Sequence, residues 1–227
     1  LVLHYNRNEA GIQRTLKTVE QIGAEAEILR CDFRELNHLA SFFKQAWALF
    51  DGLDALVNNA GIVTKTVALK DVDGAKFADT LTVNLHAPYQ LSSLFAQACI
   101  EAKHGGGIVN NTSIHGQATC EWFSAYAASK AGLDAITKVQ AVEWGQFGIR
   151  VNGLAPGVVP VERTDKILNE PSMQAKWCDR MPAGRYGTVE DMGDATAFLL
   201  SEKSAWMTGS ILTVDGGLIA RGNYPVR

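Results

Sequence analysis

Short apolar runs alternate with longer amphipathic stretches along the whole chain, and this alternation constrains the fold more than any other feature. The runs are rich in Val, Ile and Leu, and we expect them to form strands: LVLHYN, AEILRCD, DALVNNAG, GGIVNNTS, GIRVNGLAPG and SILTVDGG. Runs of this kind are typical of strands that are buried on both faces of a parallel sheet.

The stretches between the runs have the apolar periodicity of helices. We predict helices over residues Glu9–Ile22, Leu36–Phe50, Ala75–Lys103, Ser124–Phe147 and Val189–Ser201. A β-α-β-α order over the whole length predicts an α/β fold, a doubly wound parallel sheet of the Rossmann type with helices on both faces. The 227 residues suit a single domain, residues 1–227.

The overall composition favours a protein that acts on small molecules in the cytoplasm. A net charge of -3 gives no attraction to nucleic acid or anionic membranes, and the apolar runs are too short to span a bilayer. The four cysteines, Cys31, Cys99, Cys120 and Cys178, lie in or beside apolar segments, which predicts buried free thiols in a reducing compartment. Neither CxxC nor HExxH occurs, so we expect no metal site.

Four predicted strands end in small or polar residues. These ends read CD at Cys31, NNAG at Asn58, TS at Thr112 and APG at Ala155. Ligands of open α/β sheets bind beyond the carboxyl ends of the strands, so these ends predict a shared crevice for a flat, polar ligand. The alternative is ordinary turn chemistry, because Gly, Asn and Pro follow strands of any function.

Tyr126 and Lys130 lie four residues apart in a predicted helix, and Ser113 precedes the tyrosine by thirteen residues. Helical residues four apart share one face, so the two side chains can touch. An ammonium beside a phenol favours the phenolate, and Lys130 is therefore predicted to lower the pKa of Tyr126 toward neutrality. This would make a proton donor. The alternative is a surface helix with an unrelated tyrosine and a solvated lysine.

The order and spacing of NNAG, Ser113, YxxxK and a following PG resemble those of the short-chain dehydrogenases/reductases. The resemblance runs from Leu1 to about Gly217 and implies a Rossmann-like fold. It also implies that Ser113, Tyr126 and Lys130 are catalytic, and that Asn84 in TVNLHAP anchors a proton-relay water. Ser113 would bind the substrate oxygen, Tyr126 would transfer its proton, and a nicotinamide would carry the hydride.

The same resemblance implies a set of cofactor contacts. Lys130 would also hold the ribose hydroxyls of the dinucleotide, beside Tyr126. The other implied contacts come from the strand ends: Asp32 and Phe33 at the adenine, Asn59 and Gly61 in a supporting turn, Pro156 and Gly157, and Val159 at the carboxamide.

The glycine-rich pyrophosphate loop of the family, TGxxxGxG, has no counterpart among the 21 glycines. GGG at Gly105–Gly107 precedes a predicted strand instead of opening a helix, so we interpret it as a turn. The family places its first strand between those formed by LVLHYN and DALVNNAG, so we expect an unfilled place in the sheet there. We accordingly expect about 30 residues to precede Leu1, the length of a strand-and-helix half unit.

Asn6 and Arg7 are the residues expected to determine whether the cofactor is NAD or NADP. A carboxylate at the end of the family's second strand binds the ribose 2′-hydroxyl of NAD, but here a neutral amide is followed by a guanidinium. Such a pair suits the 2′-phosphate of NADP, so we favour NADP(H) over NAD(H). The alternative is that Arg7 only leads into a helix for which Asn8 is the N-cap.

The substrate is less well encoded. By the resemblance, one wall of its pocket holds His115, Cys120, Trp122 and Phe123, and a mobile loop spans Val159–Met181 with Met173 and Trp177. His115 could contact a substrate hydroxyl or phosphate, or could be an exposed loop residue. The loop could be an apolar lid or an amphipathic packing helix. The family's usual threonine is replaced at Val161, although Thr164 lies nearby.

Two classes of function stay open. One is an oxidoreductase acting on a carbonyl or secondary alcohol, either a 3-oxoacyl thioester reductase or a polyol or sugar dehydrogenase. The other is a non-catalytic dinucleotide-binding or regulatory protein on the same scaffold. In either case the two long helices Ala75–Lys103 and Ser124–Phe147 have apolar residues on more than one face, which predicts a homo-oligomer, a tetramer in this family. The second face could instead pack within the subunit.

Overall fold

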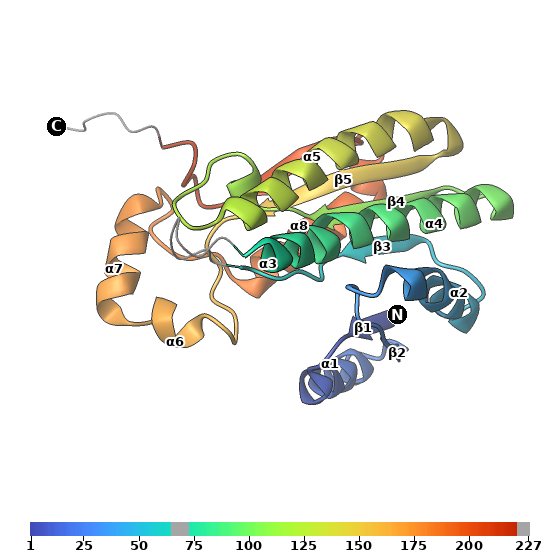
Figure 1. Ribbon diagram of the computed structural model, residues 1–227, viewed down its shortest axis with the longest axis horizontal. Helices are drawn as coiled ribbons and strands as arrows, with labels where there is room; N and C mark the ends of the chain where they lie inside the picture. Colours follow the sequence, from blue (N-terminus) through green and yellow to red (C-terminus); the bar gives the residue numbers. More distant parts are fainter. Residues whose placement is uncertain (65–72, 222–227) are drawn as a thin grey trace.

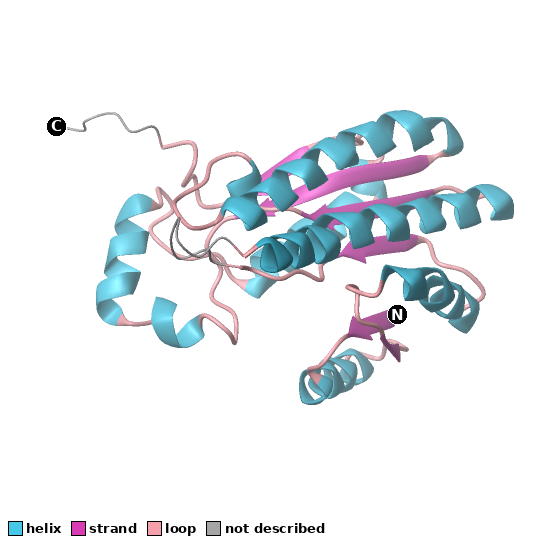
Figure 2. Ribbon diagram, in the orientation of Figure 1, coloured by secondary structure: helices cyan, strands magenta, loops and turns pink. Residues whose placement is uncertain are grey.

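The strands of the protein form two parallel sheets, in a computed structural model that describes residues 1–64 and 73–221. The first sheet pairs β1 (Val2–Tyr5) with β2 (Glu27–Arg30). The second has the order β3 (Ala55–Asn58), β4 (Gly106–Asn111), β5 (Ile149–Pro156) and β6 (Ile211–Val214). Each predicted strand is confirmed, and the described pairs are parallel (Figures 1 and 2).

Helices cover both faces of the larger sheet, as expected for a doubly wound fold. The described α-helices are α1 (Glu9–Gln21), α2 (Leu39–Leu49), α3 (Gly74–Leu81), α4 (Ala87–Ala102), α5 (Ser124–Trp144), α6 (Asp165–Leu168), α7 (Pro171–Arg180) and α8 (Val189–Leu200). Ile108 of β4 packs into a core with α2 and α4, whereas its neighbour Val109 packs with Leu199 of α8 on the opposite face. This alternation follows from the two-residue period of a strand.

One predicted helix is two helices. The span Ala75–Lys103 divides into α3 and α4, and a π turn over Thr82–His86 joins them. Single π turns inside helices often occur at functional sites. The segment Val159–Met181 also contains helices, α6 and α7. Met173 and Trp177 on α7 are half-buried and Met181 is buried, which is the pattern of an amphipathic packing helix.

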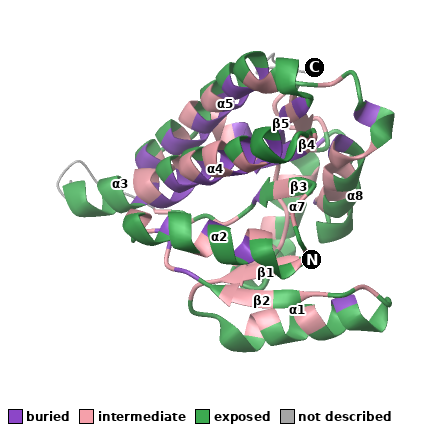
Figure 3. Ribbon diagram, turned by 90° about the vertical axis from the view of Figure 1, so that its right-hand side faces the viewer, coloured by how far each residue is buried: buried purple, intermediate pink, exposed green. Residues whose placement is uncertain are grey.

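A break separates the two sheets between β1 and β3. Among the described residues no strand pairing joins these two strands, and β3 is correspondingly open, with Val57 42% exposed. The break lies where the sequence predicts an unfilled place in the sheet. Figure 3 shows the small sheet and α1 below the main body, with most of α1 exposed.

The three glycines Gly105–Gly107 serve close packing. The prediction of a turn is wrong for Gly106 and Gly107, which are the first residues of β4. A Cβ at Gly105 would lie 2.5 Å from the Gly148 carbonyl oxygen, and one at Gly106 would lie 2.8 Å from the Phe95 ring. The glycines therefore let β4 approach its neighbours closely.

The cysteines are only partly as predicted. Cys31 and Cys99 are buried free thiols, but Cys120 is exposed and Cys178 is half-buried. The prediction of burial is wrong for these two, because Cys120 lies in the loop before α5 and Cys178 lies on the outer helix α7. None of the described helices has the length and apolar character needed to cross a membrane.

Candidate active site

The four residues predicted to be catalytic come from three elements. Ser113 follows the end of β4, Tyr126 and Lys130 lie one turn apart on α5, and Asn84 lies in the π turn between α3 and α4. All but the tyrosine are buried, and Tyr126 is half-buried. The structure therefore brings the four together beyond the carboxyl ends of β3 and β4, where an open α/β sheet binds ligands.

Tyr126 is a protonated phenol at neutral pH. Burial raises its pKa above the usual value of a tyrosine, while a hydrogen bond with Ser113 and the positive charge of Arg163 act in the opposite direction. The prediction that Lys130 brings this pKa toward neutrality is wrong for this structure. The Lys130 ammonium lies over the face of the tyrosine ring, 5.7 Å from its centre, and is not among the causes of the shift.

Lys130 is held by the backbone of β4. Its Nζ donates a hydrogen bond of 2.6 Å to the carbonyl oxygen of Asn111, and only 4% of the residue is exposed. Burial lowers its pKa to about 8, and the charge of Asp134 acts to raise it. Lys130 therefore keeps its proton at neutral pH, although its pKa of about 8 lies only a little higher.

Asn84 joins the segment after β3 to α5. Its Oδ1 accepts from the backbone N–H of Ile62 at 2.8 Å, and its Nδ2 donates to the Ile62 carbonyl at 2.8 Å and to Ser129 Oγ at 3.1 Å. Ser129 Oγ in turn donates to the carbonyl oxygen of Tyr126 at 2.7 Å. Both amide hydrogens of Asn84 thus have protein acceptors, and the residue connects the NNAG segment to the helix that carries the tyrosine.

Ser113 begins a short 3₁₀ turn, Ile114–Gly116, that faces α5. Its Oγ accepts from the N–H of His115 at 3.1 Å, which fixes the start of the turn. The His115 ring stacks on Phe123 at 4.7 Å and meets the Tyr126 ring edge-on at 5.7 Å. His115 is half-buried and burial lowers its pKa, so it is a neutral imidazole beside the tyrosine and not an exposed loop residue.

Paired amides join the ends of β3 and β4, and of the four residues only Asn59 was predicted, as a cofactor contact. Asn58 Nδ2 donates to Asn110 Oδ1 at 2.7 Å, and Asn110 Nδ2 donates to Thr137 of α5 at 2.9 Å. One residue further on, Asn111 Nδ2 donates to Asn59 Oδ1 at 2.7 Å. The signal was the NN dipeptide that ends both strands, since parallel strands in register bring equal positions side by side.

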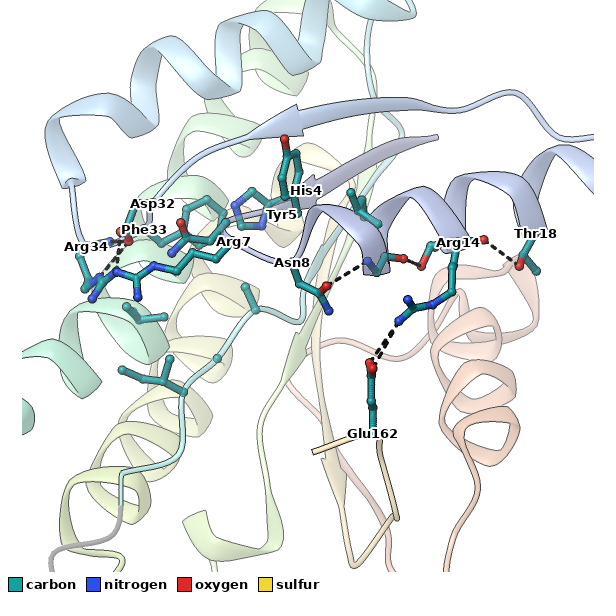
Figure 4. Close-up of a pocket in the computed structure, with 18 residues that line it drawn as sticks. His4, Tyr5, Arg7, Asn8, Arg14, Thr18, Asp32, Phe33, Arg34 and Glu162 are labelled. Carbon is teal, nitrogen blue, oxygen red and sulfur yellow. Dashed lines mark hydrogen bonds and ion pairs between the residues drawn. The ribbon is translucent and has the colours of Figure 1, made fainter. Parts of the chain in front are cut away.

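A cavity of about 760 Å³ opens beside these groups, between the two sheets (Figure 4). It contains five of the predicted cofactor residues, namely Asn6, Arg7, Asp32, Phe33 and Gly61. A Cβ at Gly61 would lie 3.3 Å from Asn84 Oδ1 and 3.8 Å from Lys130 Nζ. Glycine at this position therefore leaves space between the cavity lining and the side chains of Asn84 and Lys130.

Three arginines line this cavity, and two are paired with carboxylates. Arg34 donates to both oxygens of Asp32, at 3.0 and 2.6 Å, and holds the pKa of that carboxyl well below its usual range. Arg14 of α1 reaches Glu162, which follows β5, at 3.4 Å. Among the described residues Arg7 has no carboxylate partner (Figure 4).

Asn8 is the N-cap of α1, with its Oδ1 accepting from the N–H of Gly11 at 2.9 Å. This confirms one part of the alternative interpretation of NRNEAG, namely that Asn8 caps the helix. Arg7 nevertheless lines the cavity, so the two roles belong to neighbouring residues and do not compete.

The remaining predicted cofactor residues lie outside the cavity lining: Tyr126 and Lys130 are on α5, and the others lie at the ends of β3 and β5. Asn59 follows β3, Pro156 is the last residue of β5, and Gly157 comes directly after it. A Cβ at Gly157 would lie 2.6 Å from the Cα of Asp215, so glycine allows the segment after β6 to pass close by. Val159 packs near Gly187 at the same end of the sheet.

Residues 1–219 match the family model described as enoyl-(acyl carrier protein) reductase, a model of the short-chain dehydrogenase/reductase family. The chain is a short-chain dehydrogenase/reductase. Members of this family act on CH–OH or C=O groups with NAD(P), so the protein is an oxidoreductase, and the alternative of a non-catalytic scaffold is set aside.

Two relatives of this short-chain dehydrogenase/reductase illustrate the range of the family. It is 31% identical to the 2-dehydro-3-deoxy-D-gluconate 5-dehydrogenase of Dickeya dadantii over 209 residues, which are 92% of this chain and 82% of that protein. It is 32% identical to a 3-oxoacyl-[acyl-carrier-protein] reductase of Chlamydia trachomatis over 210 residues, 92% of this chain and 83% of the relative.

A solved structure is similar over nearly the whole chain. This is a gluconate 5-dehydrogenase from Burkholderia cenocepacia in complex with NADP and tartrate, with a TM-score of 0.87 and 29% sequence identity. The similarity covers 97% of this chain and 86% of that one. In this short-chain dehydrogenase/reductase the cavity lies at the break between the two sheets, and its lining offers the Arg7 guanidinium, which has no carboxylate partner among the described residues, to a dinucleotide phosphate.

Proposed function

We propose that the protein is an NADP(H)-dependent oxidoreductase that interconverts a secondary alcohol and a carbonyl compound, with Tyr126 as its acid/base. The observation that carries the proposal is the convergence of Ser113, Tyr126 and Lys130, in which a hydrogen bond with Ser113 acts on the Tyr126 hydroxyl and Lys130 Nζ lies 5.7 Å from the centre of the tyrosine ring. Gly61, which lines the cavity of about 760 Å³, lies next to the Lys130 ammonium. The nicotinamide, when bound, supplies or accepts the hydride.

Tyr126 and Ser113 divide the work at the substrate oxygen. The raised pKa keeps the phenol protonated at neutral pH, so Tyr126 can give a proton to a carbonyl oxygen during reduction. Oxidation needs the phenolate and is favoured at alkaline pH. The Ser113 hydroxyl, fixed at the start of its turn, holds the substrate oxygen by a hydrogen bond. Asn84 is proposed to anchor a relay water, which would use the free lone pair of its Oδ1.

Arg7 is the residue that favours NADP(H) over NAD(H). It is the cavity arginine that lacks a carboxylate partner among the described residues, whereas Arg14 and Arg34 are paired. A guanidinium that is not neutralised is a strong partner for a phosphate. Lys130 is proposed to bind the ribose hydroxyls, with the strand-end residues Asn59, Gly61, Pro156, Gly157 and Val159 beside the rest of the dinucleotide.

We propose a polyol or sugar acid as the substrate. The relatives named as gluconate dehydrogenases act on carboxylated polyols, and the charge of Arg163 reaches Tyr126 from the segment after β5. Among the described residues Arg163 is in no ion pair, so its charge is available to a substrate carboxylate. A 3-oxoacyl thioester is the second candidate, since a 3-oxoacyl reductase is also among the relatives.

We further propose a homotetramer. On the outer side of α4 and α5 several apolar residues are exposed: Tyr89, Ile100, Val139 and Val142, the last 84% exposed. An adjacent apolar groove is formed by Leu81, Leu85, Tyr89 and Ile136. This supports an intermolecular role for the second apolar face, because packing within the subunit would have buried it.

We propose that the enzyme is a single-domain, cytoplasmic protein. One hydrophobic cluster joins Cys31 and Phe33, which follow β2, to residues of α2, α4, β4 and β5, which supports a single domain. The exposed free thiol of Cys120 suits a reducing compartment.

Tyr126→Phe is expected to lower kcat by about 10²- to 10⁴-fold, because it removes the transferable proton and keeps the ring. NADPH binding, measured by fluorescence titration, should be nearly unchanged. A variant that kept a third or more of the wild-type kcat would rule out the tyrosine as acid/base.

Arg7→Ala is expected to weaken NADPH binding by about 1.5 to 3 kcal/mol, the contribution of a charge-assisted hydrogen bond, and to leave NADH binding nearly unchanged. Calorimetric titration with both cofactors checks this. Lys17→Ala on the exposed side of α1 is the matched control for loss of a positive charge. Equal losses for NADPH and NADH would show that Arg7 is structural.

A panel of oxidation substrates with NADP should give the highest kcat/KM for a carboxylated polyol such as gluconate. Arg163→Ala is expected to raise the KM for that acid by tenfold or more and to leave the KM for a neutral polyol of equal length unchanged. A preference for 3-oxoacyl thioesters in the reductive direction would select the second candidate instead.

Sedimentation at micromolar concentration should give the mass of a tetramer. Val142→Glu is expected to lower this mass, because a buried, unpaired carboxylate opposes association. Ile22→Glu, at a residue 77% exposed just after α1, is the control and should not change it. A monomer in the wild-type protein would contradict the proposed assembly.

A further inference from the structure

Asp134 is a buried acid that the proposed reaction does not use. It lies on α5 one turn beyond Lys130, in the stripe that begins with Tyr126, and only 8% of it is exposed. Lys138, one turn further, is exposed to solvent. A carboxylate at such depth is costly unless it is hydrogen-bonded or faces an opposite charge.

The turn that begins with Ser113 rests directly on Asp134. A Cβ at Gly116 would lie 2.8 Å from Asp134 Oδ2 and 3.1 Å from the backbone N of Ala131. Glycine is therefore needed at this position for space, and no side chain separates the turn from α5. Asp134 therefore lies directly under the end of the turn that Ser113 begins.

Hydrogen bonds do not satisfy this carboxylate. Asp134 Oδ1 is buried and has no hydrogen-bond partner among the described residues. The Thr112 hydroxyl has one hydrogen and two acceptors within reach, the Leu154 carbonyl at 3.1 Å and Asp134. A buried carboxylate with so few donors points to an electrostatic partner instead.

Lys130 is a buried cation one turn before Asp134 on the same face of α5. The two form no direct ion pair, because the Lys130 ammonium is bonded to the Asn111 carbonyl. Both groups are nevertheless buried, and charges act over a longer range where water does not screen them. Burial raises the pKa of Asp134, while the Thr112 hydroxyl and the charges of Lys138 and Lys130 act to lower it. Burial lowers the pKa of Lys130, and the charge of Asp134 acts to raise it.

We propose that Asp134 is a positioning residue of the active site, acting both as the buried counter-charge of the Lys130 ammonium and as the seat of the turn that carries Ser113. Its effect on turnover rests on the proposed function, but its effect on Lys130 does not.

The other titratable groups around the pair are accounted for. On α5 these are Tyr126, whose ring lies under the ammonium, and Lys138, which is exposed to solvent and whose charge also acts to lower the pKa of Asp134. From the 3₁₀ turn comes His115, which burial keeps neutral, and from the segment after β5 comes the charge of Arg163, which acts on Tyr126. Asp134 is the acid among the described residues whose charge reaches Lys130.

The test is the titration of Lys130 by NMR in protein labelled at lysine ¹³Cε, with its signal assigned by its loss in Lys130→Met. Asp134→Asn keeps the shape and removes the charge, so the pKa of Lys130 is expected to fall by one unit or more, a tenfold loss of proton affinity. Glu143→Gln, an exposed acid on the same helix, is the control and should leave it unchanged. An unchanged pKa of Lys130 in Asp134→Asn overturns the proposal.

If Asp134→Asn does not fold, the titration of Lys130 in protein that retains Asp134 provides a second test. The Lys130 signal should show a second inflection at acid pH, from the ionisation of Asp134, and this inflection should persist in His115→Gln. Its absence would equally overturn the proposal.

Turnover then separates this inference from the proposed function. In Asp134→Asn the alkaline fall of kcat/KM for carbonyl reduction should move to lower pH by the same amount as the pKa of Lys130. If the wild-type protein reduces no carbonyl compound but the NMR shift is seen, the proposed function fails alone. If turnover is found and the NMR shift is not, the inference on Asp134 fails alone.

Discussion

Parallel pairing of β3, β4, β5 and β6 brings the ends of all four strands to one edge of the sheet, and the site depends on this constraint. Because β3 and β4 are in register, the amides of Asn58 and Asn110 meet, and so do those of Asn59 and Asn111. These bonds fix the carbonyl that holds Lys130. Lys130 is thus positioned by strand register as much as by its own helix.

Electrostatics at this edge is governed by burial more than by direct ion pairs. The phenol of Tyr126 and the ammonium of Lys130 are both shifted toward their neutral forms by loss of solvent, in opposite directions on the pH scale. The charges that oppose these shifts, Arg163 and Asp134, come from outside the Ser113, Tyr126 and Lys130 set. The proton chemistry of the tyrosine therefore depends on residues that the family motif does not include.

The sequence was informative where one local pattern determines the structure. Alternating apolar runs predicted the strands and the fold class, and the spacing of Ser113, Tyr126 and Lys130 predicted which side chains converge. The sequence was less informative where tertiary packing determines the local structure or the pKa of a side chain. Apolar periodicity continued through Thr82–His86 and concealed the π turn, because one added residue hardly changes the pattern. The direction of the Tyr126 pKa shift depends on burial and on Arg163, 37 positions away in the chain, and no spacing rule reports either.

The π turn has a geometric consequence for the chain as a whole. A π turn is equivalent to one extra residue inserted in an α-helix, and each residue turns the helix by about 100°. The apolar stripe of α3 is therefore rotated relative to that of α4, so that α3 lies against α5 while α4 lies against the sheet. A single-residue deletion within Thr82–His86 would align the two stripes and turn Asn84 away from Ile62. The length of this stretch, and not only its composition, is thus under constraint, so that insertions and deletions here should be tolerated far less than substitutions on the exposed side of the same helix.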